Sequence, residues 1–250
     1  MVWVRIKYCS KPVWILPVIS VGRAATDYRA TVRILKGYRS DLLSTINIFF
    51  HNNNDPERNL LLKIILMRHG KPALSDTKKI SASTMTDWIK QYDLSDIGDD
   101  LPSQAILAQV NRPLKIFSSS LPRAISSARA LKLAPEVTDE LFREAELPVF
   151  PVPLLKLSPF QWAVIFRALW LCGWPSQAES LAMAKLRARR SAELLVNTAT
   201  QHQQSVLLTG HGIINRLIAS ELKSQGWEES FRSGKGHWGA RVFELPKSVA

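Results

Sequence analysis

Cysteine is scarce in this chain, since only Cys9 and Cys172 occur among 250 residues and they lie far apart. Two such cysteines support neither a disulfide framework nor a cysteine metal site, and this usage is typical of a reducing compartment. The five histidines are dispersed and lack the spacing of a zinc-binding helix. We therefore expect a cytoplasmic protein that needs no metal and no other cofactor.

Long hydrophobic runs are also missing. The nearest to a membrane span, residues 160–174, is short and carries Arg167 near its middle, so we interpret it as a buried or lid helix. Acidic residues number 21 against 33 basic ones, which gives a formal net charge of +12 and favours acidic partners such as phosphorylated metabolites, nucleic acid or anionic membranes. The basic residues are scattered and no nucleic-acid-binding motif is recognisable. Nucleic acid is therefore the less favoured partner.

The hydrophobic content of 46% is enough for one substantial core, and we expect one catalytic domain. The start of the chain differs from the rest, because residues 1–26 include basic but no acidic residues and a short apolar stretch broken by Pro17. A signal peptide or a basic transit-like arm are possible interpretations, but we favour an irregular or poorly ordered extension. Because residues 51–59 are polar and rich in breakers, we predict an extension at 1–59 and a domain at 60–250.

One apolar run organises the rest of the chain. Residues 61–70 have the sequence LLKIILMRHG, whose apolar part suits a buried strand of an α/β sheet and is too short for a helix. Arg68, His69 and Gly70 end the run abruptly, which on its own is more typical of a solvated strand end than of a site. Open α/β sheets nevertheless bind ligands at the carboxyl ends of their strands, so Arg68 and His69 form a candidate anion site.

Two further strand-to-helix junctions strengthen that interpretation. Residues 115–119 predict a strand that leads into Arg123 and a helix, and residues 205–209 predict a strand followed by His211 and another helix. Alternating strands and helices predict an α/β domain with a mostly parallel sheet between helical layers.

Two other local patterns predict where elements begin and end. Ser176 and Glu179 have the spacing of a capping box, which predicts the start of a long helix. Residues 241–245 predict a final strand at the edge of the sheet.

Five short motifs follow one another along the chain. They are LMRHGKP at 66–72, LSDIG at 94–98, SSSLPRAISSA at 118–128, LFREAELP at 141–148 and LLTGHGIINRL at 207–217. As an ordered set they resemble the histidine phosphatase superfamily, also called phosphoglycerate mutase-like, over roughly residues 61–245. The resemblance implies a three-layer α/β/α sandwich with one antiparallel strand in the sheet and a small helical cap insertion at about residues 148–175.

The residue types at these junctions suit phosphoryl transfer. Arg68 and Arg123 can each offer two parallel donors to phosphate oxygens, and a neutral imidazole at His69 can act as the nucleophile. The resemblance implies a phosphohistidine at His69 whose other ring nitrogen is held by a hydrogen bond. We assign His211 to phosphate stabilisation, because it precedes a helix whose N-terminal N–H groups favour an anion.

The leaving oxygen needs a proton, which the resemblance assigns to a carboxyl group within residues 141–148. That segment offers Glu144 and Glu146; Glu144 matches the motif better, while Glu146 stays open as the alternative.

The expected activity is hydrolysis of a phosphate monoester or of a protein phosphohistidine. Lys71 and Pro72 end the first motif, at positions where the mutases carry an acidic and a small polar residue, and this difference favours hydrolysis over mutase-type transfer. A catalytically idle protein that binds phosphorylated ligands is the other alternative. Trp162, Phe166 and Trp170 could face a partly apolar substrate, although core packing is the favoured role for each. The sequence does not determine the substrate or the oligomeric state.

Overall fold

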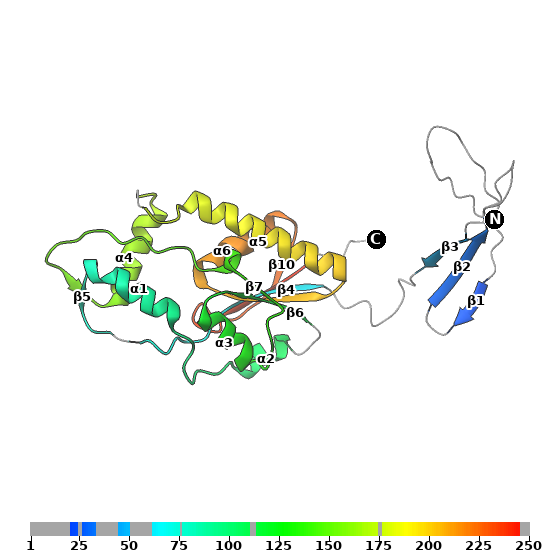
Figure 1. The fold of residues 1–250 in the computed structure, drawn as a ribbon, viewed down its shortest axis with the longest axis horizontal. Helices are drawn as coiled ribbons and strands as arrows, with labels where there is room; N and C mark the ends of the chain where they lie inside the picture. The colour runs from blue at the N-terminus through cyan, green and yellow to red at the C-terminus, as the bar shows by residue number, and fades with distance from the viewer. Residues whose placement is uncertain are drawn as a thin grey trace, which may run out of the picture. The chain divides into compact units, whose positions relative to one another are not determined.

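The computed structural model describes residues 21–24, 27–33, 45–50, 62–75, 77–110, 114–174 and 177–245. The chain divides into two compact units, residues 1–60 and 61–250. In the first unit, β1 (Val21–Ala24), β2 (Asp27–Arg33) and β3 (Thr45–Phe50) form an antiparallel sheet in that order (Figure 1).

These strands differ from the irregular structure predicted for residues 1–59. The physical reason is the alternation of β-branched and polar residues, as in the TINIFF sequence of β3, which is typical of a strand. The segments considered as a signal peptide or transit arm, residues 1–20, and the polar linker at 51–59 lie outside the described residues.

A truncated chain that begins at residue 60 should fold and unfold cooperatively, because the two compact units divide next to that position. Urea unfolding followed by far-UV circular dichroism and by tryptophan fluorescence should give coincident transitions, with the full chain as the control. A broad transition, or transitions that differ between the two probes, would show that the extension belongs to the core of the second unit.

The second unit is built on a six-stranded sheet with the order β10-β11-β4-β9-β6-β7 (Figure 1). The strands are β4 (Lys63–Arg68), β6 (Leu114–Ser119), β7 (Val137–Asp139), β9 (Ser205–Gly210), β10 (Glu228–Arg232) and β11 (Ala240–Glu244). The pairs formed by β4, β9, β6 and β7 are parallel, whereas β11 runs antiparallel to both β4 and β10. The predicted mostly parallel sheet with one antiparallel strand is confirmed.

The final strand does not lie at the edge of the sheet as predicted. Strand β11 lies between β4 and β10, and its Val242 and Phe243 are fully buried. The edge is β10, whose residues alternate between exposed and partly buried, as expected for a strand with one solvated face. The sequence prediction missed β10 because its composition, EESFR, is mostly polar and charged.

Helices cover both faces of this sheet, which confirms the three-layer α/β/α architecture (Figure 1). The helices are α1 (Met85–Leu94), α2 (Gln104–Val110), α3 (Pro122–Ala130), α4 (Pro159–Leu171), α5 (Leu181–His202) and α6 (Gly212–Ser224). Residues of α5 and α6 pack on Ile64, Leu66 and Leu208 from one side. Residues of α2 pack on Ile65 and Leu207 from the other, because successive side chains of a strand point to opposite faces.

A separate small core lies beneath α4, in the region predicted as a cap insertion. Trp162 and Phe166 stack with their ring centroids 5.1 Å apart and pack with Met85 of α1. Trp162, Phe166 and Trp170 are at most 2% exposed, so all three have the core role that the sequence favoured. The small core also includes Ile80 of β5 (Ile80–Ser81), which pairs with β8 (Lys156–Leu157).

Helix α5 begins later than the predicted capping box would place it. Ser180 is the N-cap residue and its side chain accepts a hydrogen bond from the backbone N–H of Met183. Glu179 does not cap the helix, because its carboxylate accepts two hydrogen bonds, of 2.7 and 2.8 Å, from the Arg187 guanidinium. Ser176 lies outside the described residues.

Candidate active site

His69 directly follows β4 and is almost completely buried. Its backbone N–H donates to the carbonyl of Gly210 at 3.0 Å, which holds the ends of β4 and β9 together. The ring atom Nδ1 lies 2.7 Å from the carbonyl oxygen of Gly70; because a carbonyl only accepts, Nδ1 carries the proton. The other ring nitrogen, Nε2, is therefore the unprotonated one.

Gly70 is required beside this histidine for a steric reason. A Cβ atom at this position would lie 2.6 Å from the Trp238 ring, closer than real Cβ atoms approach. The backbone N–H of Gly70 also donates to the Ser127 hydroxyl at 2.8 Å. The small residue and this hydrogen bond fix the segment that orients the His69 ring.

The surroundings of His69 keep its ring neutral. Burial, followed by the positive charge of Arg123, lowers the pKa of His69 to about 2. Arg68 and His237 act in the same direction, whereas the hydrogen bond to Gly70 opposes it. An imidazole of this kind keeps an unshared electron pair on Nε2 across the physiological pH range.

The His69 ring should therefore not titrate between pH 8 and pH 5 in the free protein. A lowered pKa means that the ring is neutral at every pH above that value, so protonation is not reached within this window. The measurement is the chemical shift of the His69 ring protons, assigned by their loss in His69→Asn. A titration midpoint near 6.5 would show that burial and the two arginines do not control this ring.

Arg123 enters the same region from the first turn of α3, where Pro122 occupies a position that needs no N–H donor. Its terminal nitrogens Nη1 and Nη2 each donate to Asp93 Oδ1 at 3.1 Å, and Nη1 also donates to the Tyr92 carbonyl at 3.0 Å. The guanidinium carbon lies 4.7 Å from the centroid of the Tyr92 ring. Asp93 and Tyr92 thus hold the buried Arg123 in place from the end of α1.

His211 lies between β9 and α6, and its ring centroid is 5.0 Å from that of His69. Its Nε2 lies 2.8 Å from the hydroxyl of Ser119 at the end of β6, while its buried Nδ1 has no partner among the described residues. Burial and the charge of Arg123 lower the pKa of His211 well below its ordinary value. The second imidazole is therefore also neutral.

The two carboxylates that the sequence left open as proton donors have different surroundings. Glu144 accepts hydrogen bonds from the backbone N–H groups of Ile213 and Ile214 at 3.1 and 3.0 Å, so it occupies the N-terminus of α6. A Cβ atom built on Gly212 would lie 3.6 Å from Arg68 Nε and 3.7 Å from Glu144 Oε2, so both groups lie close to Gly212.

Glu146 instead accepts from the backbone N–H of Glu179 at 2.8 Å. The N–H groups expected to stabilise phosphate beside His211 are thus engaged by Glu144.

All the site residues predicted from the sequence line one cleft of about 1930 Å³ at the carboxyl ends of the parallel strands. They are Arg68, His69, Arg123, Glu144, Glu146 and His211. The described residues contain no group of three or more His, Cys, Asp or Glu side chains placed to hold a metal ion.

The sequence interpretation missed four residues that contact this group. Tyr92 and Asp93 contact Arg123, Ser119 contacts His211, and the His237 ring centroid lies 5.5 Å from that of His69. Ser119 had a detectable signal, since it ends the strand before Arg123. Tyr92, Asp93 and His237 had none, because nothing in their local sequence places them beside the strand ends.

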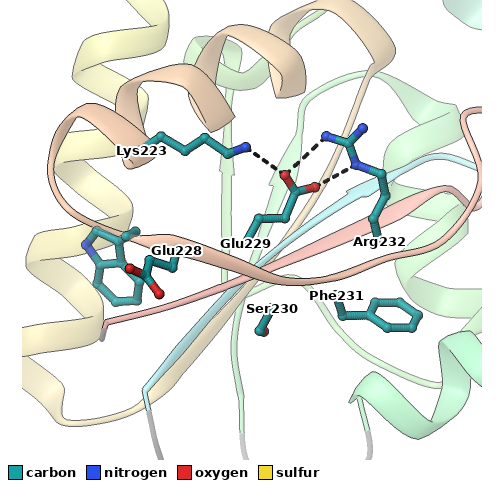
Figure 2. Close-up of a pocket in the computed structure, with 7 residues that line it drawn as sticks. Lys223, Glu228, Glu229, Ser230, Phe231 and Arg232 are labelled. Carbon is teal, nitrogen blue, oxygen red and sulfur yellow. Dashed lines mark hydrogen bonds and ion pairs between the residues drawn. The ribbon is translucent and has the colours of Figure 1, made fainter. Parts of the chain in front are cut away.

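A second, smaller hollow of about 570 Å³ lies along β10 and is lined by Lys223, Trp227 and residues 228–232 (Figure 2). Its central carboxylate, Glu229, is paired with Lys223 at 2.9 Å, Arg232 at 2.6 Å and Arg241 at 2.8 Å. These partners hold the pKa of Glu229 far below its ordinary value. The hollow contains no histidine and Glu229 is engaged by three basic side chains, so it offers none of the chemistry of the first cleft.

Residues 64–238 match the family model of the histidine phosphatase superfamily, branch 1. The match covers more than half of the chain, and the protein belongs to this superfamily. No curated protein matches the sequence. In the part of the chain that the structure describes, no helix is both long and apolar enough to cross a membrane.

Three solved structures align with this chain, and the first of them supports the fold. The open reading frame Rv3214 of Mycobacterium tuberculosis aligns with a TM-score of 0.51 and 16% identity, over 75% of this chain and 93% of that chain. A mutant of the phosphoserine phosphatase of Entamoeba histolytica, in complex with phosphoserine, aligns with a TM-score of 0.46 and 16% identity, over 75% of this chain and 92% of that chain. Phosphoglycerate mutase of Bacillus anthracis aligns with a TM-score of 0.45 and 16% identity, over 74% and 88%.

Proposed function

We propose that this protein is a phosphatase that hydrolyses a phosphate monoester, or a protein phosphohistidine, through a phosphohistidine at His69. The observation that carries the proposal is the state of the His69 ring. Its Nδ1 proton is held by the Gly70 carbonyl, so the neutral Nε2 is left as a nucleophile in a cleft that also contains Arg68 and Arg123. A guanidinium clamp beside a neutral imidazole suits a negatively charged phosphoryl group.

The first step is attack of His69 Nε2 on phosphorus. The P–N bond forms as the ester P–O bond breaks, while Arg68 and Arg123 neutralise the charge on the non-bridging oxygens and the neutral His211 ring donates a hydrogen bond to one of them. Glu144 gives its proton to the leaving oxygen, which departs as a neutral alcohol.

The second step hydrolyses the phosphohistidine. Glu144, now ionised, takes a proton from water as the water oxygen attacks phosphorus, and the P–N bond breaks to release phosphate and neutral His69. Arg123 changes partners during the cycle, because its terminal nitrogens are bonded to Asp93 and the Tyr92 carbonyl in the free protein. A phosphate dianion can replace part of the interaction with the single Asp93 oxygen.

Hydrolysis is favoured over mutase-type transfer by the residues after the first motif. The backbone N–H of Lys71 donates to Asp100 at 2.9 Å, and Pro72 forms an antiparallel β-bridge with Ile97. These contacts hold the segment against residues 97–100. A non-catalytic binding protein is the less favoured alternative, since the proposed nucleophile, clamp arginines and second histidine are all present in one cleft. The cytoplasmic location stays a prediction that rests on cysteine usage.

The test is the release of inorganic phosphate from a panel of phosphate monoesters and a phosphohistidine peptide by the purified full chain. We expect turnover with at least one member. Transfer of phosphate between 2- and 3-phosphoglycerate without release would support the mutase alternative. Tight binding of phosphorylated compounds without turnover would support the binding protein.

A further inference from the structure

The active-site cleft is much larger than a phosphate group requires. Its volume of about 1930 Å³ exceeds the roughly 300–1,000 Å³ usual for small-molecule pockets. The histidines and the clamp arginines lie at one part of it, while other walls come from α1, α4 and the segment 147–151. The nature of those other walls indicates what is esterified to the phosphate.

An aromatic cluster extends from the phosphate end into the cleft. The Tyr92 ring lies under the Arg123 guanidinium and stacks on Trp88, with ring centroids 4.9 Å apart and an angle of 18° between planes. Phe160 of α4 meets Trp88 edge-on at 5.4 Å and Tyr92 at 6.4 Å. All three rings line the cleft, so an apolar surface begins directly at the clamp arginine.

The wall continues along α4 with apolar side chains that the protein leaves exposed. Phe160, Val164 and Leu171 line the cleft and are 41%, 70% and 52% exposed. They lie on the opposite side of the helix from the buried Trp162 and Phe166, so the helix is apolar nearly all round. Large apolar side chains gathered in a concave surface mark a binding site more often than isolated ones do.

The other lysine and arginine side chains of the cleft already have partners. Lys90 pairs with Asp87 at 3.5 Å and Arg143 pairs with Glu140 at 3.4 Å. Arg187 forms two hydrogen bonds with the Glu179 carboxylate, and Arg167 donates to the backbone carbonyls of Ala145 and Glu146 while it stacks on Trp170 at 4.6 Å. A second anionic group on the substrate would therefore have to displace an existing partner of Lys90, Arg143, Arg167 or Arg187. The cleft suits a ligand that is anionic at one end only.

We propose that the substrate is a phosphate monoester of an extended apolar alcohol, whose chain lies along Tyr92, Trp88, Phe160 and the exposed face of α4. This inference rests on the proposed phosphatase function, because the cationic end of the cleft holds the phosphate. The substrate is a dispersed, monomeric ester and not a lipid within a bilayer. The reason is that a cleft enclosed by several helices and strands accommodates one alkyl chain at a time.

The test is a series of n-alkyl phosphates from methyl to decyl, each assayed below its critical micelle concentration. Each methylene buried against this wall should raise kcat/KM by about two- to fourfold until the wall is covered. A flat series, or activity only on phosphatidic acid in vesicles, would overturn the inference.

A matched pair of variants tests where the alkyl chain of the substrate lies in the cleft. Val164→Asn places an amide on the exposed wall and should reduce kcat/KM for decyl phosphate by about fivefold or more, and flatten the series. Leu154→Asn is the control, because Leu154 is fully exposed and does not line the cleft, so the series should keep its slope. Equal effects of the two changes would contradict the proposed placement.

Failure of this inference and failure of the proposed function give different results. If no phosphate monoester is hydrolysed, the proposed function fails. The affinity of n-alkyl phosphonates, measured by calorimetry, then still shows whether the cleft binds an alkyl chain, because that affinity should rise with chain length. If short esters are hydrolysed and neither kcat/KM nor phosphonate affinity depends on chain length, the phosphatase proposal stands and the apolar substrate is wrong.

Discussion

His69→Ala should abolish both turnover and acid-labile labelling of the protein by a phosphorylated substrate. The reason is that the proposed covalent intermediate needs the Nε2 nitrogen, which no other group can replace in the same position. The measurement is incorporation of ³²P after a rapid quench, with the acid lability that distinguishes phosphohistidine from a phosphoester.

The control for this substitution is His202→Ala, which removes an exposed imidazole at the end of α5. Labelling and turnover should persist in that variant. Labelling of His69→Ala at the level of the unsubstituted protein would overturn the assignment of the nucleophile, because the phosphoryl group would then be on another residue.

Glu144→Gln should slow phosphoenzyme formation from an alkyl phosphate by about 10²–10⁴-fold, the usual contribution of a general acid. An aryl phosphate with an activated leaving group needs little protonation and should be affected far less in this step. The amide keeps the size of the side chain and an oxygen that can accept from the N–H groups of Ile213 and Ile214. The measurement is the rate of the single-turnover burst with each substrate.

The same substitution at Glu146 is the matched control. Its carboxylate contacts the backbone N–H of Glu179, so Glu146→Gln should change the two burst rates equally and little. Preferential slowing of the alkyl phosphate by Glu146→Gln would move the proton donor to that residue. Equal slowing of both substrates by Glu144→Gln would show that Glu144 positions the phosphate and transfers no proton.

The sequence by itself determined the central elements of the fold. The apolar runs that became β4, β6 and β9 are too short for helices and too apolar for exposed strands, so burial in a parallel sheet was their one favourable arrangement. Polar residues directly after such strands must meet at the same edge. For that reason Arg68, His69, Arg123 and His211 could be named as one group before any coordinates were known.

Predictions from local sequence patterns were wrong where contacts with other segments of the chain determined the secondary structure. Strand β10 is polar and becomes a strand because it pairs with β11. Glu179 does not cap α5 as predicted, because its carboxylate is engaged by Arg187, eight residues further along the chain. The spacing of a capping box does not show whether another donor will bind the glutamate. In the folded protein the Arg187 guanidinium lies close enough to do so, and a charge-assisted pair of this kind is stronger than a hydrogen bond to a backbone N–H.

Only the tertiary structure decided the environment of the proposed catalytic groups. Desolvation, which lowers the pKa of His69, depends on every layer of protein packed around the ring. The choice between Glu144 and Glu146 depends on which of them meets the N-terminus of α6, a segment about seventy positions away in the chain. The sequence determined which chemical groups meet at the strand ends, while burial and distant contacts determined their charge and orientation, because both depend on three-dimensional packing.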